Sequence, residues 1–350
     1  MRPFVRPARV ALVASTLTAA LIPVATATAK TARASAARAC ATKASATTRF
    51  FSPNSFWNQS IDPGAALDRS SAGMVSNLSR TVNTEIAAST GPWFNARHDG
   101  VAIYFVGPCE RTVRVKLDHA PDAALASAWS AVPLPASAQP SSGDNDLAVW
   151  QPSTDRLWEF FQLHRAVDGW HAEWGGAIRH VSSNAGVYGT DAWPGAKPWW
   201  GVTATSFSVA GGVITANDLA AAKINHAVAL VAPNVRYRSY VTPAQRNDGS
   251  STARCSIPEG AHLRLDPSLN LARLHLPPLT RMIAEAAQRY GIIVRDYSPA
   301  VAFVGQDPTN DPHLQSLYVS AYQGMYSGQL MAAFPWSHLQ VLRMNLHNGW

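Results

Sequence analysis

Two strand-like runs and the turn between them decide the fold: Leu-Trp-Glu-Phe-Phe-Gln-Leu-His at 157–164, Asp168-Gly169, and Trp-His-Ala-Glu-Trp-Gly-Gly-Ala-Ile at 170–178. Asp-Gly is the preferred pair for a two-residue hairpin turn. Such a turn places His164 opposite Glu173 and Gln162 opposite Gly175. Because side chains alternate across a strand, one face is largely apolar. The other face is expected to hold Trp158, Phe160, Gln162, His164, His171 and Glu173.

Further short runs rich in β-branched and aromatic residues recur between turns. They lie at 101–106, 112–117, 147–151, 224–231, 292–295 and 301–304, with the last two expected to form a hairpin. Helical patterns cover 74–87, 218–223 and 278–290, and polar residues 306–330 are expected to form a long loop. We therefore predict a mostly β fold, an antiparallel β-sandwich or jelly roll with a few peripheral helices.

The N-terminus predicts export. Residues 1–29 combine three early arginines, an apolar run and Ala-Thr-Ala at 27–29, which is the pattern of a cleaved signal peptide. Residues 30–49 have almost nothing to bury, so we expect a disordered leader. Residues 51–350 then form a single β-rich domain that is secreted and extracellular, with no membrane span.

The charge of the chain is concentrated in that N-terminal segment. Eight of the 29 basic side chains, and no acidic one, lie within residues 1–50. The remaining 300 residues hold 21 basic and 22 acidic side chains. Nucleic acid is therefore not an expected partner.

Three cysteines follow the export signal, Cys40, Cys109 and Cys255. Export permits a disulfide, and Cys40 lies in the leader, so Cys109–Cys255 is the expected pair. No cysteine has another cysteine or a histidine at ligand spacing, so no metal and no cofactor are expected.

The polar face of the predicted hairpin suits a sugar. Rings such as Trp158 and Phe160 can stack on the apolar faces of sugars, while His171 and Glu173 can hold hydroxyl groups. The His164–Glu173 pair could fix one histidine tautomer, as a general base requires. The alternative is the ordinary polar outer face of an antiparallel sheet.

Other candidates lie outside the hairpin. His226 alternates with apolar residues, so it is either a core histidine or a base tuned by burial. Arg246 precedes a turn and is either solvated or able to clamp a carboxylate. Tyr188 and the pair Trp199-Trp200 lie in a Gly- and Pro-rich segment that could flank a groove. Motifs of serine hydrolases, zinc peptidases and nucleotide-binding enzymes are absent.

Several segments resemble a set of secreted bacterial proteins of uncharacterised activity. They are Val-Ala-Gly-Gly-Val-Ile from 209, Ile-Asn-His-Ala-Val from 224, Pro-Ala-Gln-Arg from 243, Ile-Pro-Glu-Gly-Ala-His-Leu-Arg-Leu-Asp-Pro from 257 and Arg-Tyr-Gly-Ile-Ile-Val-Arg-Asp from 289. The likeness covers roughly residues 50–305. It implies one continuous domain and export.

Gln162-Leu-His164 resembles the Gln-Ile-His strand of jelly-roll alginate lyases, in which the glutamine neutralises a uronate and the histidine is the base. The Arg-x-Glu-x-Arg strand of those enzymes is absent, and Tyr322-Gln-Gly-Met-Tyr326 loosely matches their tyrosine strand. The resemblance implies β-elimination, with Gln162 and Arg246 on the carboxylate, His164 or His226 as base and Tyr188 or Tyr322 as acid.

The sequence therefore predicts a secreted carbohydrate-active enzyme, with a polysaccharide or cell-envelope glycan as partner. The favoured reaction is that of a polysaccharide lyase acting on a uronate-containing glycan. Two alternatives stay open: a glycoside hydrolase that uses Glu173 with another carboxylate, and a non-catalytic protein that binds glycan or cell envelope.

Overall fold

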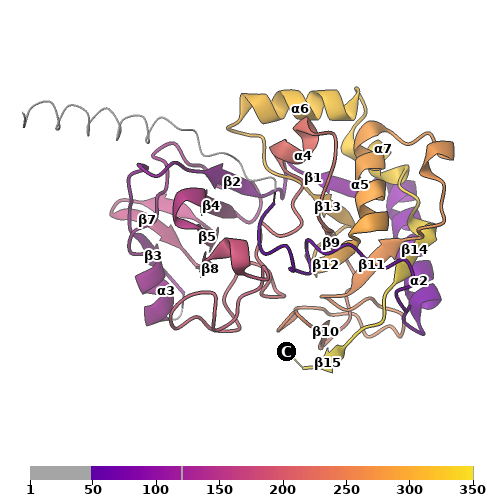
Figure 1. Ribbon diagram of the computed structural model, residues 1–350, viewed down its shortest axis with the longest axis horizontal. Helices are drawn as coiled ribbons and strands as arrows, with labels where there is room; N and C mark the ends of the chain where they lie inside the picture. Colours follow the sequence, from indigo (N-terminus) through magenta and orange to yellow (C-terminus); the bar gives the residue numbers. More distant parts are fainter. Residues whose placement is uncertain (1–48, 120, 350) are drawn as a thin grey trace, which may run out of the picture. The chain divides into compact units, whose positions relative to one another are not determined.

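The strands of this chain form four separate sheets, of six, four, three and two strands, among the residues that the structure describes (Figure 1). The structure is a computed structural model that describes residues 49–119 and 121–349, all of which belong to one unit. The predicted signal peptide and all but the last residue of the predicted leader lie outside the described residues. Export therefore stays a prediction.

The six-stranded sheet has the order β1-β13-β9-β12-β11-β14. Its strands are β1 (Trp93–Asn95), β9 (Val228–Ala232), β11 (His262–Leu265), β12 (Ile292–Tyr297), β13 (Ala302–Val304) and β14 (Leu339–Val341). All five residues of β9 are buried, which explains why this strand is apolar throughout. Its alternate side chains enter two different apolar clusters, Val228 and Leu230 on one face, Ala229 and Val231 on the other.

Helices cover the first of these clusters. They include α2 (Ser71–Ala88), α5 (Pro278–Arg289), α6 (Pro312–Tyr322) and α7 (Ser327–Ala332). In α5, Leu279, Ile283 and Ala287 recur at helical spacing and are buried in this cluster. The helix ends before Gly291, whose φ of +90° favours glycine.

The second cluster is shared with the four-stranded sheet, which has the order β2-β4-β5-β8. Its strands are β2 (Ala102–Phe105), β4 (Leu147–Gln151), β5 (Arg156–Phe161) and β8 (Trp174–Arg179). The three-stranded sheet orders β3 (Val115–Leu117), β7 (Gly169–Ala172) and β6 (His164–Ala166), and α3 (Ala123–Ala128) packs beside it. The two-stranded sheet pairs β10 (Ser239–Val241) with β15 (Leu346–Asn348).

Several local predictions are confirmed, and two are wrong. The helical patterns at 74–87, 218–223 and 278–290 correspond to α2, α4 (Ala216–Ala220) and α5. The expected hairpin of 292–295 with 301–304 does not form, because β12 and β13 pair with opposite edges of β9. The expected loop at 306–330 contains α6 and most of the residues of α7.

The predicted hairpin forms with a different register. Its turn uses Val167 and Asp168, so that Ala166 pairs with Gly169 and His164 with His171. Gln162 has a positive φ of 56°, which divides the first run into β5 and β6. His164 therefore does not face Glu173. The prediction of one shared polar face is also wrong, because Trp158 and Phe160 are buried in the core.

The described residues form a mostly β architecture of several mixed sheets. A jelly roll or antiparallel sandwich is not confirmed, because four strand pairings are parallel and the sheets do not close. The predicted Cys109–Cys255 disulfide is wrong, since Cys255 carries a free thiol and Cys109 is engaged elsewhere.

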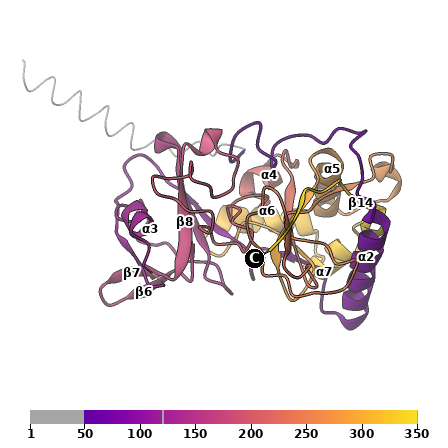
Figure 2. The same ribbon diagram turned by 90° about the horizontal axis from the view of Figure 1, so that it is seen from below.

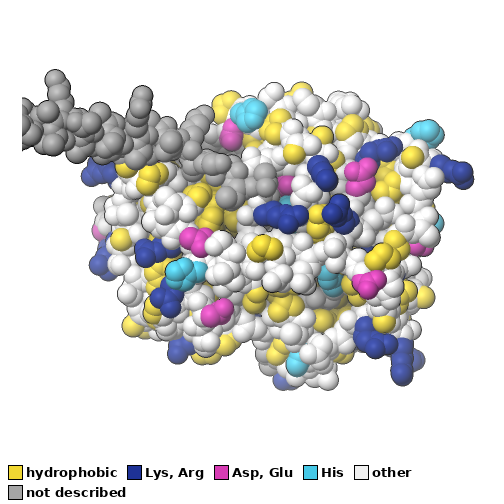
Figure 3. Space-filling view, in the orientation of Figure 1, with side chains coloured by type: hydrophobic (Ala, Val, Ile, Leu, Met, Phe, Trp, Pro, Cys, Tyr) yellow, Lys and Arg dark blue, Asp and Glu magenta, His cyan; other side chains and the backbone are white. Residues whose placement is uncertain are grey.

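The described part of the chain contains no helix with the length and apolarity needed to cross a membrane. On the face drawn in Figure 3, Lys and Arg side chains lie among Asp and Glu side chains rather than in one block. This distribution suits the near-neutral balance of residues 51–350.

Candidate active site

A cleft of about 870 Å³ lies where the six-stranded and four-stranded sheets meet. The ends of β12 and β13 line it from one sheet, and Phe161 of β5 and Trp174 of β8 line it from the other. Loops that contain Asp99, Asp144 and Asp248 complete the lining. The cleft is therefore assembled from segments that are far apart in the sequence.

Acidic side chains dominate the lining of this cleft. Two guanidinium groups, Arg246 and Arg295, accompany a larger set of carboxylates. The acidic residues are Asp99, Asp144, Asp146, Glu173, Asp248 and Asp296. Grouping so many carboxylates in a partly enclosed space is unfavourable for folding, so such a group is a candidate for chemistry.

A bulge in β12 aims two charged residues at the cleft. Val294 pairs with Leu230 and Asp296 pairs with Val231, so Arg295 is an extra residue in the strand. Bulges re-aim side chains and are common next to active sites. As a result the consecutive residues Arg295 and Asp296 both line the cleft.

Three carboxyl groups converge at this wall. Oxygen atoms of Asp248, Glu259 and Asp296 all lie within 4.8 Å of one another. Glu259 is fully buried, and its Oε2 accepts a hydrogen bond from the Asp248 backbone N–H at 3.2 Å, while no described residue hydrogen-bonds its Oε1. Groups this close can share protons or a cation, because three full negative charges would repel each other strongly.

Burial and mutual repulsion keep part of this trio protonated. Burial, reinforced by the charge of Asp296, raises the pKa of Glu259 to about 11. Burial and the charge of Asp248 raise the pKa of Asp296 to about 7, against the opposing effect of Arg295. Two backbone N–H groups, of Ala204 and Tyr297, donate to the Asp296 carboxylate. Asp296 can therefore hold or release a proton near neutral pH.

The two arginines are engaged by the protein itself. Arg246 donates to Ser206 Oγ at 2.8 Å and to the carbonyl oxygens of Gly201 and Thr203 at 3.2 and 2.9 Å. Arg295 donates to the Val209 carbonyl oxygen at 2.7 Å. Both side chains fix the loops at the cleft wall and place positive charge beside the acids.

Asp146 is a further buried acid at the cleft. Burial, with help from the charge of Asp144, raises the pKa of Asp146 well above its usual range. Its Oδ1 is buried without a hydrogen-bond partner in the described residues. A buried, unsatisfied carboxyl oxygen is unfavourable in a purely structural role.

Aromatic rings line the outer part of the cleft. Trp174 donates from its indole nitrogen to the Trp199 carbonyl oxygen at 3.2 Å, and its ring meets His119 edge-on. Trp199 and Tyr297 stay 52% and 45% exposed. Exposed rings beside polar groups can stack on the apolar faces of sugars.

The structure brings only three of the sequence-predicted site residues to this cleft: Glu173, Trp199 and Arg246. His164 and His171 lie on β6 and β7 beside Asp118 instead. Gln162 lies at the break between β5 and β6, where its side-chain oxygen accepts from Asn145.

The remaining predicted residues are structural or lie elsewhere. Tyr188 is fully buried and donates to Glu159 at 2.8 Å, and Trp158, Phe160 and Trp200 are core residues. His226 is buried 3.3 Å from Asp218 and bonds the Ala227 carbonyl. Tyr322 lines a different, mostly apolar pocket with Tyr318. The residues assigned to β-elimination therefore do not converge.

The sequence did not predict the carboxyl trio of Asp248, Glu259 and Asp296. Asp248 follows Asn247 and precedes Gly249, and Glu259 lies between Pro258 and Gly260. Both acids lie in turn sequences, where the sequence does not distinguish a functional acid from one that is simply solvated. Asp296 is the penultimate residue of β12, and the end of this strand is the local signal that pointed to a sheet edge.

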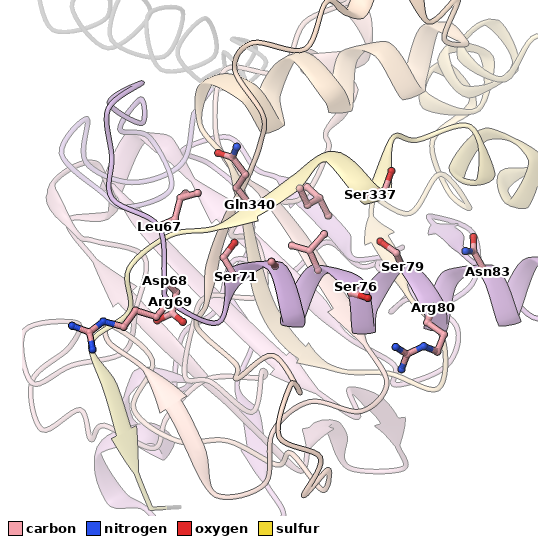
Figure 4. A pocket seen from close by; sticks show the side chains of 13 residues that line it. Leu67, Asp68, Arg69, Ser71, Ser76, Ser79, Arg80, Asn83, Ser337 and Gln340 are labelled. Carbon is pink, nitrogen blue, oxygen red and sulfur yellow. The ribbon is translucent and has the colours of Figure 1, made fainter.

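Another pocket, of about 830 Å³, follows α2 (Figure 4). Four serines line it, with Arg69, Arg80 and Asn83, and Asp68 is its only carboxylate. Asp68 already accepts a hydrogen bond from the Ser70 N–H. This groove thus offers no paired acids and no aromatic platform.

Comparison with known proteins adds no assignment, because no family model, no curated protein and no solved structure matches the chain.

Proposed function

We propose that this chain is a secreted glycoside hydrolase whose active site is the acidic cleft. The observation on which the proposal rests is the convergence of Asp248, Glu259 and Asp296 within 4.8 Å, at the wall of a cleft that two of them, Asp248 and Asp296, line together with aromatic rings. Hydrolysis of a glycosidic bond needs one protonated and one ionised carboxyl group beside the bond.

Asp296 is the general acid in this scheme. It lines the cleft, and its pKa of about 7 leaves it protonated in mildly acidic solution. It would donate its proton to the leaving glycosidic oxygen as the bond to the anomeric carbon breaks. Glu259 lies within 4.8 Å of Asp296 and stays neutral, so it adds no second negative charge beside the acid.

Asp248 is the partner carboxylate. It is exposed at the cleft, so it can approach an anomeric carbon. Oxygen atoms of Asp248 and Asp296 lie within 4.8 Å of each other, which is too close for the roughly 6.5–9.5 Å carboxyl separation of inverting enzymes. Asp248 is therefore expected to act as nucleophile, with retention of anomeric configuration.

The cleft supports hydrolysis better than β-elimination. A lyase must neutralise the uronate carboxylate, whereas Nε and Nη2 of Arg246 already donate to Ser206, Gly201 and Thr203. A polyanionic chain would also enter a lining that holds six carboxyl groups and two arginines. A neutral glycan avoids this repulsion and can stack on Trp174 and Trp199.

The test is to incubate the purified protein with neutral and uronate-containing polysaccharides, measuring new reducing ends and ultraviolet absorbance. We expect reducing ends without unsaturated product from at least one neutral polymer. Asp296→Asn and Asp248→Asn should each lower turnover about 10²- to 10⁴-fold. The matched control is Glu285→Gln, which changes an exposed carboxylate of α5 and should leave turnover unchanged.

Two results would reject the proposal. Ultraviolet-absorbing product would identify a lyase, and glycan affinity without any turnover would identify a binding protein. Proton NMR of the first product then tests the stereochemistry, because retention is expected and inversion would exclude Asp248 as nucleophile.

A further inference from the structure

A second group of chemistry-bearing side chains lies outside the cleft, on the three-stranded sheet. In Figures 1 and 2 this sheet is on the opposite side of the described chain from α2. His164 of β6 pairs directly with His171 of β7, and their ring centroids are 5.7 Å apart. Asp118 follows β3 and reaches both rings.

We propose that Asp118, His164 and His171 form a Zn²⁺ site. One potential ligand atom from each residue lies within 4.8 Å of the others. The His171 Nδ1 is 2.6 Å from Asp118 Oδ1, and the His164 Nε2 is 3.8 Å from Asp118 Oδ2. Tetrahedral zinc with bonds of about 2.0–2.1 Å separates its ligand atoms by about 3.4 Å, a spacing that lies between these two observed contacts.

In each histidine, the ring nitrogen that would not bind the metal has a hydrogen-bond acceptor, as is usual in metal sites. His164 Nδ1 is 2.9 Å from the Gln162 carbonyl oxygen, which can only accept, so this nitrogen is the donor and Nε2 keeps its lone pair. His171 donates from Nε2 to Asp168 Oδ1 at 2.9 Å and from Nδ1 to Asp118 Oδ1 at 2.6 Å, so Zn²⁺ would replace the Nδ1 proton while Asp168 keeps the other N–H. Zinc-bound histidines characteristically donate their other N–H to a carbonyl or a carboxylate.

The surroundings complete this arrangement. Asp168 also pairs with Lys116, which fixes the carboxylate that orients His171. The three ligand side chains are 52%, 16% and 33% exposed for His164, His171 and Asp118, so the ion can enter and a fourth position faces solvent. Two histidines and one carboxylate with an open position are a known zinc ligand set.

The site would link three strands. Asp118 follows β3, His171 belongs to β7 and His164 belongs to β6. His119, which follows Asp118 in the sequence, lines the acidic cleft. Zinc bound here would therefore stabilise the small sheet at the rim of the cleft, and this inference stands whether or not the cleft hydrolyses glycans.

Isothermal titration of the metal-stripped full chain with Zn²⁺ tests the proposal, with Co²⁺ absorbance as a report on coordination. We expect about one Zn²⁺ per chain and visible Co²⁺ bands of a four-coordinate ion. His164→Ala and Asp118→Asn should each weaken Zn²⁺ binding at least tenfold, while His313→Ala, an exposed histidine of α6, should leave it unchanged.

A positioning variant separates zinc binding from a simple ion pair. Asp168→Asn should weaken Zn²⁺ binding about 10- to 100-fold while the Co²⁺ bands persist at saturation. Absence of Zn²⁺ binding by the unmodified chain would overturn the proposal. Binding that His164→Ala leaves unchanged would overturn it as well, and circular dichroism confirms that each variant is folded.

Discussion

Asp296→Asn should stabilise the protein at alkaline pH while it abolishes the proposed hydrolysis. The pKa of this carboxyl is raised to about 7 in the fold by burial and by the charge of Asp248. An unfolded chain gives aspartate a pKa of about 3.9. Folding therefore favours the protonated form, and the wild-type protein loses stability as the pH rises from about 4 through about 7.

The magnitude follows from the size of the shift. About 3 units at about 1.4 kcal/mol each give about 4 kcal/mol, and partial solvent exposure reduces this to about 2–4 kcal/mol. The asparagine variant has no charge to bury, so its free energy of unfolding should not contain this loss. Relative to wild type, the variant should gain about 2–4 kcal/mol between pH 4 and pH 8.

Urea unfolding at pH 4, 6 and 8, followed by tryptophan fluorescence, measures this difference. Glu285→Gln serves as control, because an exposed carboxylate should change the unfolding free energy little at any pH. A pH-dependent gain below about 0.5 kcal/mol, or one of opposite sign, would refute the assignment of a raised pKa to Asp296. Stability gained where activity is lost is a characteristic of catalytic acids.

Other substitutions test separate parts of the argument. Glu159→Leu leaves the buried donors of Tyr188, Ser208, Val209 and Ala210 without their acceptor, so it should lower the unfolding free energy by at least about 3 kcal/mol; a urea midpoint near wild type would contradict this. Glu259→Gln should change stability at pH 7 by less than about 1 kcal/mol in the same assay, because Glu259 is already neutral there. Glu85 has its pKa raised to about 7 by burial, so Glu85→Gln should gain about 1–3 kcal/mol over wild type between pH 4 and pH 8, and an equal pH profile would disprove it. Trp199→Ala should raise the KM for a glycan about tenfold with an unchanged melting temperature, since the ring is more than half exposed; an unchanged KM would remove it from the binding site.

Local signals predicted individual elements well. The proline at the start of α5, its apolar spacing and Gly291 define this helix within the sequence itself. The apolar run of β4 was predicted with its bounds, because such a buried strand is short and ends at a proline. Each of these signals depends on neighbours within a few residues.

The strand pairing and the acidic cleft could not be predicted, because both depend on residues that are far apart in the sequence. The sequence does not show that β12 and β13 pair with opposite edges of β9, because strand pairing depends on packing between distant segments. The turn of the 157–178 hairpin moved by one residue, which changed every cross-strand partner. Asp248, Glu259 and Asp296 meet only after three separate segments pack, so no local pattern could pair them.

The extra residue in β12 has a consequence for transplanting this site into other proteins. A regular strand shows neighbouring residues to opposite sides, so an Arg-Asp dipeptide copied into an ordinary strand would send one of its two charges into the wrong layer. Here the irregular pairing after Val294 presents cation and acid together. A designer who grafts the cleft must therefore copy the backbone irregularity along with the side chains.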